Sequence, residues 1–123
     1  LSMPTRRSSK RVRFLLASIE NYLGNPCEYE QCTLEHVCPY NPSEAWIDHF
    51  GDGFNDVKDR LGNVVLIHRD TMQRASFEEK KASYAQSSFK LAQHVATYDD
   101  WNLTTVNKYQ AWLARQAVQT WRI

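Results

Sequence analysis

An acidic residue beside a histidine is the pair in this sequence best suited to chemistry. Glu35 and His36 stand in a short β-prone run that Pro39 ends, and Gly62-Asn63 opens a second β-prone run later in the chain. Imidazole titrates near neutral pH and can act as a general base. A carboxylate is a hard oxygen ligand that suits Mg²⁺. Asn63 in the turn could hydrogen-bond His36 or its backbone and so fix the ring.

These side chains match the needs of phosphodiester hydrolysis. A base must activate water, a cation must neutralise charge on the phosphate and the leaving oxygen, and the base must be held in the right tautomer. We expect His36 to be the base, Asn63 to orient it, and Glu35 and Asp70 to bind Mg²⁺ or Mn²⁺. Adjacent residues on a regular strand point to opposite faces. The strand must therefore be bulged, or must end, for Glu35 and His36 to share a site. His68, close to Asp70, is a second candidate for the base.

The elements that must position these residues form a mostly helical α+β domain with a small central two-stranded element. Helical spacing of apolar residues and capping residues predict its helices. Predicted strands cover residues 31–37 and 63–67, and predicted helices cover 8–23, 43–50, 55–60 and 76–84, then one capped by Ser87 or Ser88 and a last one opened by Thr104 or Thr105. Residues spaced for one apolar face of the last helix are Val106, Tyr109, Leu113, Ala117 and Trp121. Because a lone two-stranded element is marginal in water, the helices must serve as its platform.

The three cysteines allow a different site. Cys27, Cys32 and Cys38 cannot all pair within the chain, and with His36 they could form a Cys₃His zinc site. Cys38 and His36 are two residues apart on a strand, which suits two ligands poorly unless the chain turns. No secretory signal precedes them, so we expect a reduced, cytoplasmic setting.

Length and charge narrow the class of protein. A chain of 123 residues predicts a single domain with a real core, and no apolar run approaches the roughly 20 residues of a membrane span. The net charge of +1 provides no global attraction to nucleic acid. Basic residues that could contact the backbone of double-stranded DNA are Arg6, Lys10, Arg13, Arg69 and Arg74. A solubilising helix face is the other interpretation of the basic residues near the N-terminus.

Short motifs follow one another in a specific order along nearly the whole chain. They are Arg11-Val12-Arg13-Phe14-Leu15-Leu16, Glu35-His36-Val37-Cys38-Pro39, Trp46, Leu61-Gly62-Asn63-Val64-Val65-Leu66, Phe77-Glu78-Glu79-Lys80-Lys81, Tyr84, Ser88-Phe89, Trp101 and Trp121. This order resembles the C-terminal HNH (ββα-metal) nuclease domain of the GmrSD family of modification-dependent restriction and antiphage nucleases. The resemblance implies a metal-dependent endonuclease that nicks or cleaves foreign DNA.

The resemblance also implies roles for single residues. His36 takes the place of the general base, Glu35 that of a metal ligand and Asn63 that of the residue that positions the histidine. The family's last metal residue is usually an asparagine, which the loop at residues 68–74 lacks. Asp70 is the nearest usable ligand there, and Gln73 is a poorer one. The family also tends to carry an arginine where Tyr109 stands.

These departures leave an alternative function open, that of an HNH-like module that only binds DNA or a partner protein. In the family, an N-terminal nucleotide-hydrolysing domain of the ParB-like kind precedes the nuclease domain. A first residue other than Met and a helix that starts almost at once agree with this arrangement. We therefore expect residues 1–123 to be a single HNH domain, the C-terminal fragment of a longer protein.

Overall fold

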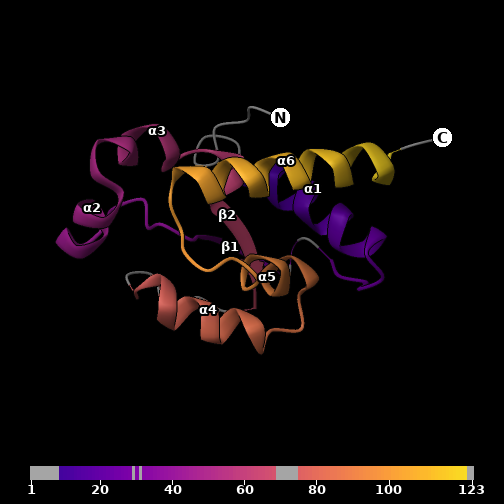
Figure 1. Cartoon of the computed structure of the whole chain (residues 1–123). Coiled ribbons are helices and arrows are strands. Elements are labelled where there is room, and N and C mark those ends of the chain that lie inside the picture. The colour runs from indigo at the N-terminus through magenta and orange to yellow at the C-terminus, as the bar shows by residue number, and fades with distance from the viewer. Residues whose placement is uncertain (1–8, 29, 31, 69–74, 122–123) are drawn as a thin grey trace.

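A computed structural model describes residues 9–28, 30, 32–68 and 75–121, and in this part of the chain two strands stand among helices (Figure 1). The elements in chain order are α1 (Ser9–Tyr22), β1 (Thr33–His36), α2 (Glu44–Phe50), α3 (Phe54–Val57), β2 (Val64–Ile67), α4 (Phe77–Ala85), α5 (Lys90–Val95) and α6 (Leu103–Thr120), with short 3-10 turns at Gly51–Gly53 and Leu61–Asn63. The predicted class, a mostly helical α+β domain with a small two-stranded sheet, is confirmed.

The sheet is antiparallel and lies between two groups of helices. Thr33 pairs with Ile67 and His36 with Val64. Helices α1 and α6 pack together on one side, and α4 and α5 pack together on the other (Figure 1). Because both α1 and α5 also contact β2, the short strands are covered by the platform that their marginal stability requires.

Helix α1 carries much of the core. Its residues Val12, Leu16 and Ile19 have no solvent exposure, and they recur at the spacing of one helix face. Two predicted caps are confirmed as well. Ser43 Oγ accepts a hydrogen bond from Trp46 N–H at the start of α2 (3.5 Å), and Ser76 Oγ accepts one from Glu79 N–H at the start of α4 (3.2 Å).

The predicted caps of α5 and α6 are wrong. Helix α5 begins after Phe89, and the carboxylate of the fully buried Glu20 accepts from its first amides, Lys90 N–H (2.6 Å) and Leu91 N–H (3.0 Å). A distant carboxylate thus caps the helix in place of a local serine. Its negative charge is favoured there by the positive end of the helix dipole. Helix α6 is capped by Asn102, in a capping box with Thr105.

The apolar face of α6 is shorter than the sequence predicts. Val106, Tyr109 and Leu113 are fully buried, but Trp121 is 50% exposed. The reason is that α6 ends at the edge of the described part of the chain, where none of the drawn helices or strands covers its last turn (Figure 1). None of the helices in the described residues is long and apolar enough to cross a membrane.

The 3-10 turn before β2 lies directly against α6. Gly62 N–H donates to Gln110 Oε1 (3.0 Å), and so does Arg60 Nε (3.0 Å). A Cβ atom added at Gly62 would collide with the main-chain oxygen of Val106 and would lie 2.7 Å from Cβ of Gln110. Glycine is therefore required by close approach of two main chains rather than by its own torsion angles.

Replacing this glycine should loosen the turn that begins β2. We expect Gly62→Ala to lower the free energy of unfolding by about 1–3 kcal/mol, as overpacking does, because a helix backbone cannot move aside cheaply. Urea-induced unfolding followed by circular dichroism measures the change. Gly53→Ala is the matched control. Gly53 has φ −73° and an added Cβ would meet nothing within 4 Å, so this variant should be as stable as the wild type or slightly more stable. Equal stability of Gly62→Ala and the wild type would contradict the close approach.

Candidate active site

His36 is the last residue of β1, and regular pairing runs without a bulge from Thr33 to His36. The strand therefore ends at the histidine, the second of the two conditions under which it could share a site with Glu35. The two side chains nevertheless contact different neighbours. Glu35 is buried against Tyr84 of α4. The half-buried His36 packs against the ring of Tyr40 in an edge-to-face contact, with 5.7 Å between ring centroids.

The Glu35 carboxylate lies in the protein interior. Its side chain is 4% exposed, Tyr84 donates its hydroxyl hydrogen to Oε2, and Lys80 Nζ lies 4.0 Å from Oε1. Lys80 and Tyr84 are four residues apart on α4, and so they share one face of that helix. A cation and a hydroxyl group together replace the water that a buried carboxylate has lost.

Lys80 joins α4 to the end of β1. It is fully buried, and its ammonium group donates to the carbonyl oxygens of His36 (3.0 Å) and Val37 (2.9 Å). Hydrogen bonds from a charged donor are stronger than those between neutral groups. The Trp46 ring flanks the same ammonium, 6.0 Å from its centroid. The backbone on either side of the His36–Val37 peptide is therefore held by a side chain of α4.

Asn63 holds the next part of that backbone. Its Oδ1 accepts from Cys38 N–H (2.9 Å) and from the indole of Trp101 (2.9 Å), and its Nδ2 donates to Cys38 O (2.9 Å) and to the carbonyl at the end of α3 (3.4 Å). Its main-chain oxygen accepts from Val37 N–H (2.8 Å). An amide offers two lone pairs and two hydrogens, so the side chain is fully used. Asn63 thus binds the backbone that follows His36, and not the imidazole.

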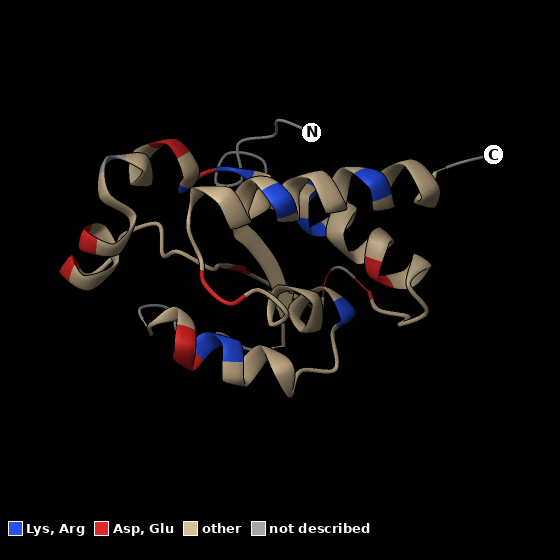
Figure 2. Cartoon of the chain, viewed as in Figure 1, with Lys and Arg blue, Asp and Glu red and all other residues tan. Residues whose placement is uncertain are grey.

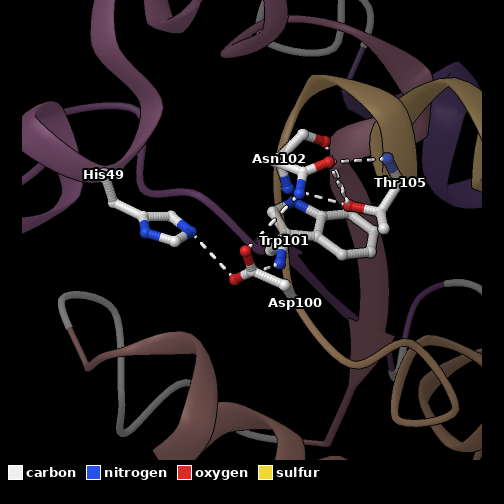
Figure 3. A network of polar contacts seen from close by, with 5 residues as sticks. All are labelled: His49, Asp100, Trp101, Asn102 and Thr105. Carbon is white, nitrogen blue, oxygen red and sulfur yellow. Dashed lines mark hydrogen bonds and ion pairs between the residues drawn. The ribbon is translucent and has the colours of Figure 1, made fainter.

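A polar network before α6 fixes Trp101 in turn (Figure 3). Asp100 Oδ1 accepts from Trp101 N–H (2.8 Å) and lies 2.8 Å from His49 Nε2, while Asn102 Nδ2 donates to Asp100 Oδ2 (3.4 Å). The pair of His49 and Asp100 ties α2 to the start of α6. The sequence does not signal this pair, because 51 residues separate its members.

The remaining histidines have structural surroundings. His68 Nε2 lies 2.7 Å from Ser88 Oγ, and its ring packs on Phe89 at 4.5 Å between centroids. His94 stacks on Trp112 with 3.7 Å between centroids, and burial lowers its pKa. His68 thus contacts the start of α5, and His36 stays the stronger candidate for a base.

Two residues near His36 escaped prediction from the sequence. Tyr40 packs against the imidazole of His36 in the edge-to-face contact, and the ammonium of Lys58 lies 4.8 Å from the centroid of the Tyr40 ring. The Tyr40 ring thus contacts both the imidazole of His36 and the ammonium of Lys58, which is at cation–π distance from it. Nothing in the local sequence marks Tyr40 or Lys58 for this position, since β1, α2 and α3 must first be folded together.

A Mg²⁺ site centred on Glu35 does not fit the described residues. Among them, no group of three or more His, Cys, Asp or Glu side chains is arranged to hold a metal ion. Glu35 is buried with the positive charge of Lys80 close to it, and a second cation there would be repelled. Asp70, the other predicted ligand, and Gln73 lie outside the described residues.

The zinc alternative gains no support either. Cys27 Sγ donates to Ala17 O (3.9 Å) and Cys32 Sγ donates to Glu28 O (3.3 Å). Burial raises the pKa of Cys27 to about 12. Cys38 lies in the backbone segment held by Asn63, and burial raises its pKa to about 12. Among the described residues, the three cysteines and His36 are not gathered into one ligand set.

The basic residues predicted to contact DNA are only partly described. Lys10 is exposed in the first turn of α1, and Arg13 is half-buried with its Nη1 3.5 Å from Cys32 O. Arg6, Arg69 and Arg74 lie outside the described residues. Figure 2 places acidic residues on α2, α3 and α4, whereas the lysine and arginine of α6 have no acidic residue beside them on that helix.

Strands β1 and β2 and the helix α4 form a small ββα unit on a helical platform. Side chains of α4 contact the first strand, and His36 ends that strand. A family model for the C-terminal domain of GmrSD restriction endonucleases matches residues 2–116. The chain belongs to this family, and its class is that of restriction endonuclease domains. A search of curated proteins found no match.

Removing the Asn63 side-chain amide should destabilise the domain. We expect Asn63→Ala to lower the free energy of unfolding by about 3 kcal/mol or more, because it leaves the amide and carbonyl of Cys38 and the indole of Trp101 buried without this partner. Chemical unfolding measures the loss. Asn55→Ala, at an exposed position of α3, is the matched control and should change stability by no more than about 0.5 kcal/mol. Similar values for the two variants would refute the role of the Asn63 contacts.

Proposed function

We propose that this domain is an HNH-type endonuclease that hydrolyses phosphodiester bonds of foreign DNA, with His36 as the general base. The observation that supports it most is the position of His36, at the end of β1 in a ββα unit, with the backbone that follows it bound by Lys80 and Asn63. Membership of a restriction endonuclease family supports DNA as the substrate.

In the proposed reaction, His36 takes a proton from a water molecule. The water oxygen then forms a bond to phosphorus, and the bond between phosphorus and the 3′ oxygen breaks. Imidazole suits this role because its ordinary pKa lies close to the pH of the cell. Asn63 contributes by binding the main chain of Val37 and Cys38, which fixes the backbone next to His36 and so helps to position its side chain.

The family also leads us to propose a divalent ion, Mg²⁺ or Mn²⁺. When bound, such an ion neutralises charge on the phosphate and the leaving oxygen. With Glu35 already bound by Tyr84 and Lys80, its protein ligands would have to include Asp70 or another residue outside the described part of the chain.

We further propose that Lys10 and Arg13, together with Arg6, Arg69 and Arg74, contact the backbone of double-stranded DNA. Such contacts position the duplex without reading its sequence. We also propose that the domain works in the cytoplasm behind an N-terminal ParB-like domain of the same polypeptide. The second candidate function is that of a module that binds DNA or protein without cutting. The pairing of the Glu35 carboxylate with Lys80 favours this function, because it takes up a predicted metal ligand.

His36→Ala should abolish nicking of a supercoiled plasmid, because the loss of a general base typically costs a factor of about 10²–10⁴. The assay is run with Mg²⁺, with Mn²⁺ and with a chelator, and circular dichroism checks that the variant is folded. His49→Ala, which removes a histidine from the network in Figure 3, is the matched control and should still nick. Wild-type protein that binds plasmid but never nicks it would favour the binding module instead. Equal nicking by His36→Ala and wild type would exclude His36 as the base.

Neutral replacement of the described basic residues should weaken DNA binding. Each lost phosphate contact lowers the slope of log K against log salt by about one, so Lys10→Gln with Arg13→Gln should flatten it by about two. Fluorescence anisotropy of a labelled duplex over a salt series gives the slope. Lys90→Gln is the control, because the main chain of Lys90 binds Glu20 near the opposite end of α1. An unchanged slope in the double variant would mean that this part of α1 is only a solvated face.

A further inference from the structure

The most unusual charged group in the described residues is Lys80. Lysine is almost never fully buried unless it is paired, yet Lys80 has no solvent exposure. Its neighbours include the carboxylate of Glu35 at 4.0 Å, two main-chain carbonyls and the ring of Trp46. A buried charge held in this way is costly to form and costly to disrupt.

The two carbonyls that Lys80 binds belong to His36 and Val37. Val37 lies beyond the last pair of the sheet, since the pairing ends at His36 and Val64. The sheet therefore cannot fix the direction in which the chain leaves His36. Lys80 on one side and Asn63 on the other perform that task, through bonds to both carbonyls and to the amides of Val37 and Cys38.

We propose that Lys80 is a positioning residue for His36 and that Glu35 is the buried counter-ion of Lys80 instead of a metal ligand. This inference rests on the proposed function for the role of His36. Lys80 orients the imidazole through the main chain, and Glu35 keeps the lysine charged and in place with the help of the Tyr84 hydroxyl.

The charges argue against Glu35 serving both roles. A Mg²⁺ ion bound to this carboxylate would lie within a few ångströms of the Lys80 ammonium, and like charges at that separation repel strongly in a buried site. A ligand role for Glu35 would set this repulsion against the bonds from Lys80 to both carbonyls. The support of the segment after His36 would then be weakened where the proposed chemistry needs it fixed.

The test compares Lys80→Met, Glu35→Gln and the double variant with a matched control. Methionine matches the length of the apolar stem of lysine but lacks the ammonium. The double variant also removes the carboxylate charge that Lys80→Met would leave buried alone, and so it guards against a variant that merely fails to fold. Lys81→Met is the control. Lys81 is the next residue of α4, is 35% exposed and binds Tyr98 O at 2.7 Å, away from His36.

Two readouts are taken from each folded variant. One is plasmid nicking, with kcat, KM and the Mg²⁺ concentration for half-maximal rate. The other is the NMR spectrum of the imidazole groups, in which the His36 signals are identified by their loss in His36→Ala. The NMR signals need no turnover. A wild type that never nicks would overturn the proposed function, and the imidazole signals would still test the positioning by Lys80.

In the double variant we expect the His36 signals to move and kcat to fall between about tenfold and about a hundredfold, as small displacements of a catalytic group do. KM should stay within about twofold, and Lys81→Met should behave as the wild type. In Glu35→Gln the half-maximal Mg²⁺ concentration should stay within about twofold, since no ligand is lost. Unchanged His36 signals and kcat in the double variant would overturn the role of Lys80. A rise of about tenfold or more in the Mg²⁺ requirement of Glu35→Gln would restore Glu35 as a ligand.

Discussion

The candidate active site depends on how the backbone of three residues, His36 to Cys38, is bound. The carbonyls of His36 and Val37 accept from Lys80, the amide of Val37 donates to the main chain of Asn63, and both polar groups of Cys38 bind the Asn63 side chain. Buried backbone groups need partners. Here the partners come from two other elements, Lys80 from α4 and Asn63 from the turn before β2, so the position of the segment depends on the docking of both.

This dependence explains why so much of the polar chemistry of the domain is buried. The side chains of Asn63 and Lys80 have no solvent exposure, and each is held in place by hydrogen bonds or an ion pair with other residues. Trp101 donates to Asn63, and Asp100 binds the amide of Trp101 and reaches His49 on α2. Glu35 and Tyr84 support Lys80. Polar networks of this kind specify one arrangement because an incomplete network is costly in a medium of low dielectric constant.

A short two-stranded sheet by itself would hold the candidate base His36 only weakly, and the surrounding helices compensate for this. Glu20 shows the same logic at a distance from the site, since its buried carboxylate on α1 closes the N-terminal end of α5. The charge of one helix thereby holds another helix against β2. Charged and amide side chains thus join the elements of this domain, alongside the apolar core.

Much of the fold was predictable because its signals are local. The apolar spacing of α1, the serine caps of α2 and α4 and the β-branched run of β2 all act within a few residues. Likewise, the order of short motifs indicated the family, which the comparison confirms. The adjacent acid and histidine before a proline indicated the segment that we propose as the site.

Only the tertiary structure decided which groups these residues contact. The cap of α5 comes from Glu20, some seventy positions away in the sequence, and the sequence offered serines next to the helix instead. The sequence predicts Glu35 to be an accessible metal ligand, because it stands beside a histidine. Nothing local in the sequence indicates that Lys80 and Tyr84 bind its carboxylate in the fold. Local patterns determine helices, strands and caps through short-range sterics and hydrogen bonds. The partners of a buried charge are chosen by how the elements pack, and that choice is made between residues far apart in the chain.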